Sequence, residues 1–168
     1  MTTCEVTGSY VVRTPRMRFR AMAVNVALTL GLLAVVVGAV ASAAEDASPA
    51  MAKWGLLGTW SSNCAGPPTR DNPRYTWVRH GALAFLDRDY GDARDSNRVL
   101  AAAALPGGAI ELLVEFKASS QTRVNIYVKG DDGRIQMFVN HDIHGNYSVR
   151  DGKLVDSGGA PPWDTRCR

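Results

Sequence analysis

The chain has 168 residues, with 19 Lys and Arg against 16 Asp and Glu, and it contains three cysteines. Four arginines and one acid, Glu5, lie in the N-terminal segment, and subtracting them leaves fifteen bases and fifteen acids. The remainder therefore lacks the basic excess on which nucleic-acid binding relies. We expect no nucleic-acid partner.

The N-terminal segment has the three parts of a secretory signal. A positive stretch, Arg13 to Arg20, precedes an uncharged stretch from Ala21 to Ala44, and Ala41-Ser42-Ala43 supplies the small residues that signal peptidase requires. We predict a signal peptide over residues 1–43. Because about 20 apolar residues can also span a bilayer, an uncleaved membrane anchor is the alternative. Both interpretations place the rest of the chain outside the cytoplasm, and we expect the protein to be periplasmic or secreted.

Beyond this segment the composition is that of one small domain. Residues 44–52 are mostly small and carry two acids near their start, which is typical of a flexible leader. Residues 53–168 suffice for one hydrophobic core and are too few for two domains.

Two cysteines, Cys64 and Cys167, remain when Cys4 is assigned to the N-terminal segment. Cysteines in an oxidising compartment usually pair, so we predict one disulfide that joins the start of the domain to its end. Two free thiols are the alternative.

Short apolar or alternating runs, separated by turn residues, predict an antiparallel all-β domain. The pairs Asp132-Gly133 and Asp151-Gly152 favour tight hairpins between the runs. The tail from Gly158 to Trp163 is expected to be an irregular strap leading to Cys167. We expect strands near residues 57–61, 74–79, 82–88, 97–105, 109–117, 122–129, 134–140, 145–150 and 153–156.

Three of these runs alternate apolar and polar residues, which predicts one buried and one solvated face. The predicted inner face comprises Ile110, Leu112, Val114 and Phe116, then Val124, Ile126 and Val128, and then Ile135, Met137 and Val139.

About eight sequential strands in a domain of this length close most easily into a meander barrel, because closure removes the exposed edges of an open sheet. A two-sheet sandwich is the alternative fold.

The motif Gly58-Thr59-Trp60 resembles the Gly-x-Trp opening of the lipocalin and calycin superfamily. The resemblance implies a short helical turn before the first strand, a glycine that lets the backbone bend, and a tryptophan that plugs the closed end of the barrel. It also implies a basic side chain over that tryptophan, for which Arg150 and Arg166 are the candidates.

The sequence shows no catalytic apparatus and no cofactor motif in this domain. His141, Asp142 and His144 are the only clustered metal-type ligands, and no second cluster completes a four-ligand sphere, so we assign no metal site. A small hydrolase would need a histidine and a carboxylate that converge in one pocket.

We interpret the chain as a non-enzymatic binding protein for a small apolar or amphipathic ligand held in the barrel. The alternative is an envelope protein-interaction module or hydrolase inhibitor, acting through the loop from Cys64 to Asn72 and the Cys167 strap. The residues expected to line the ligand site are Tyr75, Trp77, Phe85, Ile126, Met137 and Val139.

The N-terminal pattern predicts that the exported product begins close to Ala44, because Ala41-Ser42-Ala43 fits the cleavage site. Intact mass or N-terminal sequencing of exported protein measures this. A product that retains residues 22–43 and stays in the membrane fraction would show an anchor instead.

Overall fold

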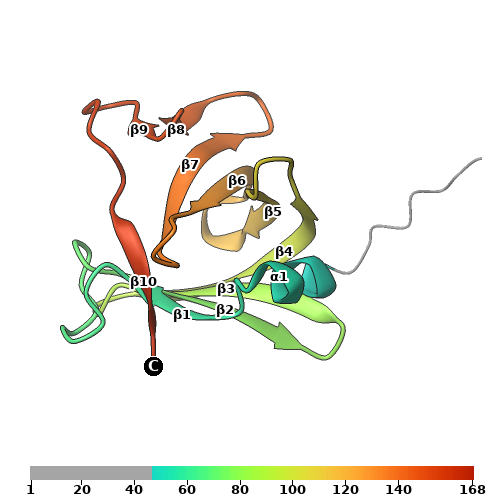
Figure 1. Cartoon of the computed structure of the whole chain (residues 1–168), viewed down its shortest axis with the longest axis horizontal. Helices are drawn as coiled ribbons and strands as arrows, with labels where there is room; N and C mark the ends of the chain where they lie inside the picture. The colour runs from blue at the N-terminus through green and yellow to red at the C-terminus, as the bar shows by residue number, and fades with distance from the viewer. Residues whose placement is uncertain (1–46) are drawn as a thin grey trace, which may run out of the picture. The chain divides into compact units, whose positions relative to one another are not determined.

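A computed structural model describes residues 47–168 and shows an all-β domain built around a closed, antiparallel, eight-stranded barrel (Figure 1). The predicted fold class is confirmed, and the sandwich alternative is excluded because one continuous sheet closes on itself. The predicted signal peptide and the first residues of the predicted leader lie outside the described residues.

Secondary-structure elements follow one another through short connections. They are α1 (Ala47–Trp54), β1 (Gly58–Ser61), β2 (Arg74–His80), β3 (Leu83–Asp89), β4 (Arg94–Ala104), β5 (Ile110–Phe116), the 3-10 turn η1 (Lys117–Ser119), β6 (Gln121–Lys129), β7 (Ile135–Asp142), β8 (Tyr147–Arg150), β9 (Lys153–Leu154) and β10 (Trp163–Cys167).

The ring consists of β1 to β7 in sequence order, with β10 inserted between β7 and β1. β10 pairs with β1 over three residue positions and with β7 at only two, Trp163 opposite Gln136 and Asp164 opposite Ile135. The upper part of β7 pairs instead with β8, which continues into β9 outside the ring. β8 and β9 therefore form a flap at the top of the molecule (Figure 1).

One sequence prediction about the ends of the domain is incomplete and another is wrong. The expected irregular strap covers residues 158–162, but residues 163–167 after it form a regular strand, β10, which closes the barrel. The expected flexible leader is helical from Ala47, because Ala47 and Met51, one turn apart, bury one face of α1. Pro49 lies in the first turn of this helix, where its missing N–H breaks no hydrogen bond.

α1 covers one end of the barrel, which we call the closed end. The Trp54 indole donates a hydrogen bond to the Gly108 carbonyl in the β4–β5 turn, and the Lys129 ammonium at the end of β6 donates one to the Trp54 carbonyl. Met51 and Leu56, both fully buried, belong to the core cluster that also contains Trp60 and Trp77. Side chains therefore fill the closed end.

The Gly-x-Trp segment has a physical reason for each of its residues. Gly58 has a φ of +131°, and a β-carbon there would lie 2.8 Å from the Arg166 side chain, so only glycine fits. Trp60 is 2% exposed, and its indole donates to the Leu56 carbonyl. Of the two candidate bases, Arg166 is the cross-strand neighbour of Trp60, whereas Arg150 stacks on Tyr147.

The predicted inner face of β6 is reversed. Asn125 and Tyr127 are buried, whereas Ile126 between them is on the outer face. Cross-strand neighbours share a face, and the β5–β6 register places Leu112 opposite Asn125 and Ile110 opposite Tyr127. Sequence alternation defines two faces but does not say which one is inside, and on β6 the polar residues are inside.

Within residues 47–168, no helix is both long and apolar enough to cross a membrane.

Trp60 should be a large contributor to stability, because truncating a buried large aromatic leaves a cavity. We expect Trp60→Ala to lower the free energy of unfolding by ~3–5 kcal/mol in denaturant titration. Trp54→Ala is the matched control, since Trp54 is only half-buried and its loss should cost less. Equal losses in the two variants would contradict the assignment of Trp60 to the core.

Candidate functional site

A cavity of about 390 Å3 lies inside the barrel away from α1. Its volume falls in the lower part of the usual range for ligand pockets, roughly 300–1,000 Å3. Apolar and polar side chains both face it, from the barrel strands and from the β8–β9 flap. They are Tyr75, Leu86, Arg88, Phe116, Ser119, Gln121, Arg123, Asn125, Tyr127, Met137, Asn140, Ser148, Val149 and Leu154.

Two hollows of larger volume lie on the surface, and no large apolar side chain lines either of them. One, of about 520 Å3, lies beside β10 and contains the Asp132–Arg134 ion pair. The other, of about 630 Å3, lies along β2 to β4 and contains the Asp89–Arg94 ion pair. The cavity inside the barrel is therefore the better candidate for a ligand site.

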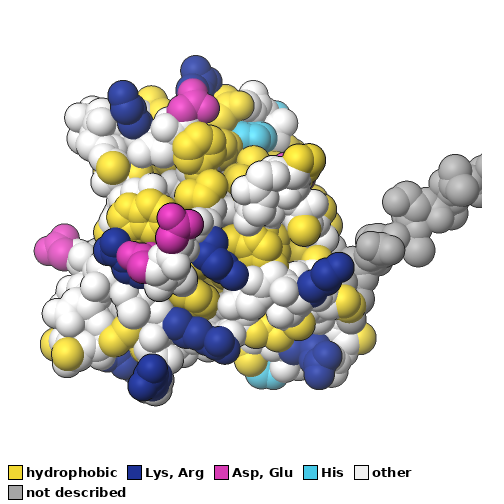
Figure 2. All heavy atoms as spheres, in the orientation of Figure 1, with side chains coloured by type: hydrophobic (Ala, Val, Ile, Leu, Met, Phe, Trp, Pro, Cys, Tyr) yellow, Lys and Arg dark blue, Asp and Glu magenta, His cyan; other side chains and the backbone are white. Residues whose placement is uncertain are grey.

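The face shown in Figure 2 combines two kinds of surface. Hydrophobic side chains run through its middle, and charged side chains of both signs stand beside them.

One polar cluster in the cavity, which we call the Arg123 network, consists of Arg123, Asn125, Asn140 and Ser148. Arg123 Nε donates to Asn140 Oδ1 at 2.8 Å, and Asn140 Nδ2 donates to Asn125 Oδ1. Ser148 of β8 donates to the same oxygen of Asn140. Because strands β6, β7 and β8 each contribute a member, the network fixes the flap against the barrel wall.

A second polar pair lies on the neighbouring wall. Arg88 donates two parallel hydrogen bonds to the carboxylate of Asp95, and its guanidinium carbon lies 4.6 Å from the centre of the Phe116 ring. The hydrogen bond from Arg88 holds the pKa of Asp95 below its usual range. The positive charge of Arg88 is thus balanced within the protein.

Burial perturbs three acids of the inner barrel wall. Desolvation raises the pKa of Asp164 to about 6, and none of the hydrogen bonds or ion pairs of the described residues involves its carboxylate. Desolvation also raises the pKa of Tyr75 and of Tyr127, and repulsion from Asp164 adds to both shifts. The buried position of these groups on the inner barrel wall is therefore the main cause of all three shifts.

The predicted ligand-binding residues separate into three groups. Tyr75 and Met137 line the cavity, whereas Trp77 is 1% exposed and packs edge-on against the Tyr127 ring in the core. The other three predicted residues do not line the cavity, and each lies on the outer face of its strand, next to buried neighbours. They are Phe85, Ile126 and Val139.

The outward position of Val139 has a local cause. The β6–β7 register shifts between Ile126 and Tyr127, so Val139 pairs with Ile126 and Met137 pairs with Tyr127. Phe138 is the extra residue of this bulge, and it reverses the inside–outside alternation of β7.

The residues that sequence reasoning missed are the polar ones, above all Arg88, Arg123 and Asn140. Polar residues on strands usually face solvent, so the sequence predicts Arg123 and Asn140 on the outer face. One available signal was the alternation of Arg123 and Asn125 with three β-branched residues, which fits an inner polar face as well as an outer one.

The histidine cluster is organised by a turn. The Asp142 carboxylate accepts hydrogen bonds from the backbone N–H groups of His144 and Asn146 and from the Asn146 amide. These bonds, the Asn146 side chain first, lower the pKa of Asp142 to about 2. The His141 ring lies against Tyr147. Among residues 47–168 there is no group of three or more side chains that could hold a metal ion.

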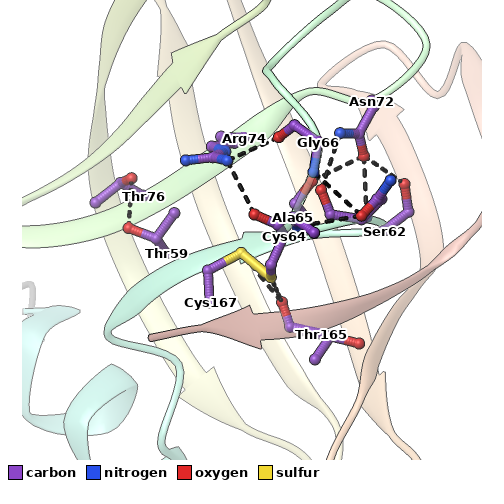
Figure 3. Close-up of a disulfide and its surroundings, with 12 residues drawn as sticks. Thr59, Ser62, Cys64, Ala65, Gly66, Asn72, Arg74, Thr76, Thr165 and Cys167 are labelled. Atoms are coloured by element: carbon purple, nitrogen blue, oxygen red, sulfur yellow. Dashed lines mark hydrogen bonds between the residues drawn. A yellow bond between two sulfur atoms is a disulfide. The ribbon is translucent and has the colours of Figure 1, made fainter.

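The predicted Cys64–Cys167 disulfide is present and joins the loop after β1 to the last residues of β10 (Figure 3). Asn72 organises the same loop, since its side-chain oxygen accepts hydrogen bonds from the Ser61 and Ser62 hydroxyls and from the Asn63 N–H. Arg74 donates to the carbonyls of Cys64 and Gly66. The loop from Ser62 to Pro73 is therefore held at both ends.

Comparison with protein-family models, curated proteins and solved structures finds no match to this chain.

The pKa of Asp164 predicts a specific pH dependence of stability. The folded state favours the protonated form, so it holds more protons than the unfolded state between about pH 4 and pH 6, and stability falls as the pH rises through this window. Asp164→Asn removes this loss. We expect it to raise the free energy of unfolding above pH ~7 by up to ~2–3 kcal/mol, and much less near pH ~3.

Denaturant titration at the two pH values measures this effect. Asp131→Asn, at an exposed position in the β6–β7 turn, is the control and should show no such difference. An Asp164→Asn effect of the same size at both pH values would contradict a desolvated carboxylate.

Proposed function

We propose that this protein is an exported, non-enzymatic binding protein that holds a small amphipathic ligand inside its barrel. The observation that carries the proposal is the cavity of about 390 Å3, which apolar and hydrogen-bonding side chains line together. Concave sites of this kind, mostly apolar with a few placed polar groups, are the usual form of small-molecule pockets.

The composition of the walls favours an amphipathic ligand over a purely apolar one. Leu86, Phe116 and Val149 offer apolar contact, whereas Arg123 and Gln121 offer hydrogen-bond donors. Covering those donors with hydrocarbon would leave them without partners, which costs free energy. A ligand with a polar end avoids this cost.

Two observations support a site of action outside the cytoplasm. The disulfide supports an oxidising compartment, since such bonds are rare in the cytosol. The N-terminal segment has the charge pattern and small residues of a cleaved signal.

A second candidate function is that of an interaction module for an envelope protein. The observation that favours it is the loop from Ser62 to Pro73, which Asn72, Arg74 and the disulfide hold in one conformation. A preorganised loop loses little conformational entropy when a protein partner binds it.

The ligand hypothesis is tested with the neutral fluorescent probe N-phenyl-1-naphthylamine. We expect saturable binding at one site per molecule. Leu154→Trp should weaken it about tenfold or more, because Leu154 lines the cavity from β9 and the larger ring occupies its space. Val155→Trp is the matched control, since Val155 is the next residue, is 58% exposed and does not line the cavity.

Absence of saturable binding by the wild-type protein, both of this neutral probe and of the anionic amphipathic probe 1-anilinonaphthalene-8-sulfonate, would overturn the ligand hypothesis in favour of the interaction module. Equal weakening by the two tryptophan variants would place the bound probe elsewhere than in the barrel.

A further inference from the structure

We infer that the ligand is anionic, with a carboxylate-like head group bound by Arg123. This inference rests on the proposed function and narrows it to a chemical class: small amphiphiles with one negative charge at the end of an apolar tail. It comes from the charges of the cavity wall and from the way in which Arg123 is held.

Two arginines line the cavity, and only one of them is paired with an acid. Arg88 has its charge balanced by the two hydrogen bonds to Asp95. Arg123 takes part in none of the ion pairs of residues 47–168, and every acceptor that it contacts is uncharged. A half-buried guanidinium without a counter-charge is a site at which an anion gains free energy.

The nearest acid by sheet register does not supply that counter-charge. Asp142 lies opposite Arg123 on β7, but its carboxylate accepts three N–H groups of its own turn, from His144 and Asn146. Those bonds occupy its oxygens, and none of the ion pairs of residues 47–168 joins Asp142 to Arg123. The guanidinium of Arg123, which lines the cavity, thus has no charged partner.

The hydrogen bonds of Arg123 divide into one anchor and several weak contacts. Nε donates to Asn140 at 2.8 Å, which fixes the plane of the guanidinium. The Nη atoms contact Gln121, Ser148 and the Asn146 carbonyl at 3.3–3.4 Å, beyond the usual range of an N–H···O bond. A carboxylate can replace these long contacts with two short, parallel, charge-assisted bonds.

The apolar part of the cavity begins next to this point. Arg123 precedes Asn125 and Tyr127 on the inner face of β6, and Met137 lies opposite Tyr127. Phe116 lies opposite Gln121 on β5. A head group on Arg123 would therefore leave its tail against Phe116 and Met137, which is the arrangement that an amphiphile with one charged end requires.

The test uses three ligands with the same ten-carbon tail, namely decanoate, decanol and protonated decylamine, titrated calorimetrically into the whole domain at neutral pH. We expect decanoate to bind about tenfold or more tightly than decanol, because a charge-assisted pair contributes that much, and decylamine to bind weakest. Added salt should weaken the binding of decanoate and leave that of decanol nearly unchanged.

Arg123→Gln should reduce the affinity for decanoate about tenfold or more and change that for decanol by less than about twofold. Arg123→Lys should retain part of the preference for decanoate, since it keeps the charge without the two-pronged geometry. Arg98→Gln is the control: it removes the same charge from an exposed position on the outer face of β4 and should change neither affinity.

The outcomes separate the two hypotheses. If none of the three ligands binds, the proposed function fails. If decanol binds as tightly as decanoate to the wild-type protein, the ligand function stands and the anionic head group is overturned. That comparison needs no variant, so it decides the question even if Arg123→Gln does not fold.

Discussion

The closure of the barrel at two residue pairs between β7 and β10 determines the rest of the architecture. β10 pairs with β7 only at Ile135 and Gln136. The backbone N–H and C=O groups along the rest of that β7 edge therefore need other hydrogen-bond partners. β8 supplies the missing strand, and with β9 it forms the flap that provides Ser148, Val149 and Leu154 to the cavity. The flap side of the cavity wall is therefore a consequence of a ring in which β10 pairs with only part of β7.

The interior is divided between two chemistries. At the closed end Trp60, Trp77 and the α1 residue Met51 belong to one continuous core. Beyond this core, Arg88 and Arg123 lie on the inner faces of β3 and β6. A buried cation costs free energy unless hydrogen-bond acceptors or acids surround it. Arg88 is bonded to the carboxylate of Asp95, which makes it a structural arginine. Arg123 is bonded to the neutral amide of Asn140, which leaves it as a candidate ligand anchor.

Strand positions and the disulfide were predictable from the sequence, because turn residues and the oxidising context act locally. β10 was missed because Pro161-Pro162 precedes it and Asp164, Thr165 and Arg166 give it no apolar alternation. The inner face of β6 was reversed because its register is set by pairing with β5, a contact between strands that periodicity within one strand cannot contain. The same limit hid the site, since Arg123 is interior only when the register puts it opposite Val114.

The disulfide has a further consequence for how molecules of this protein meet one another. β10 is the strand whose release would open the ring and expose two unpaired edges, which is the geometry from which strand exchange between identical copies begins. Because Cys167 is bonded to Cys64, β10 stays beside its own β1 even when its short pairing with β7 is broken. Another copy cannot donate its β10 in place of the tethered one. The disulfide therefore acts against domain swapping. It does so beside the β7–β10 pairing, where only two residue pairs close the ring.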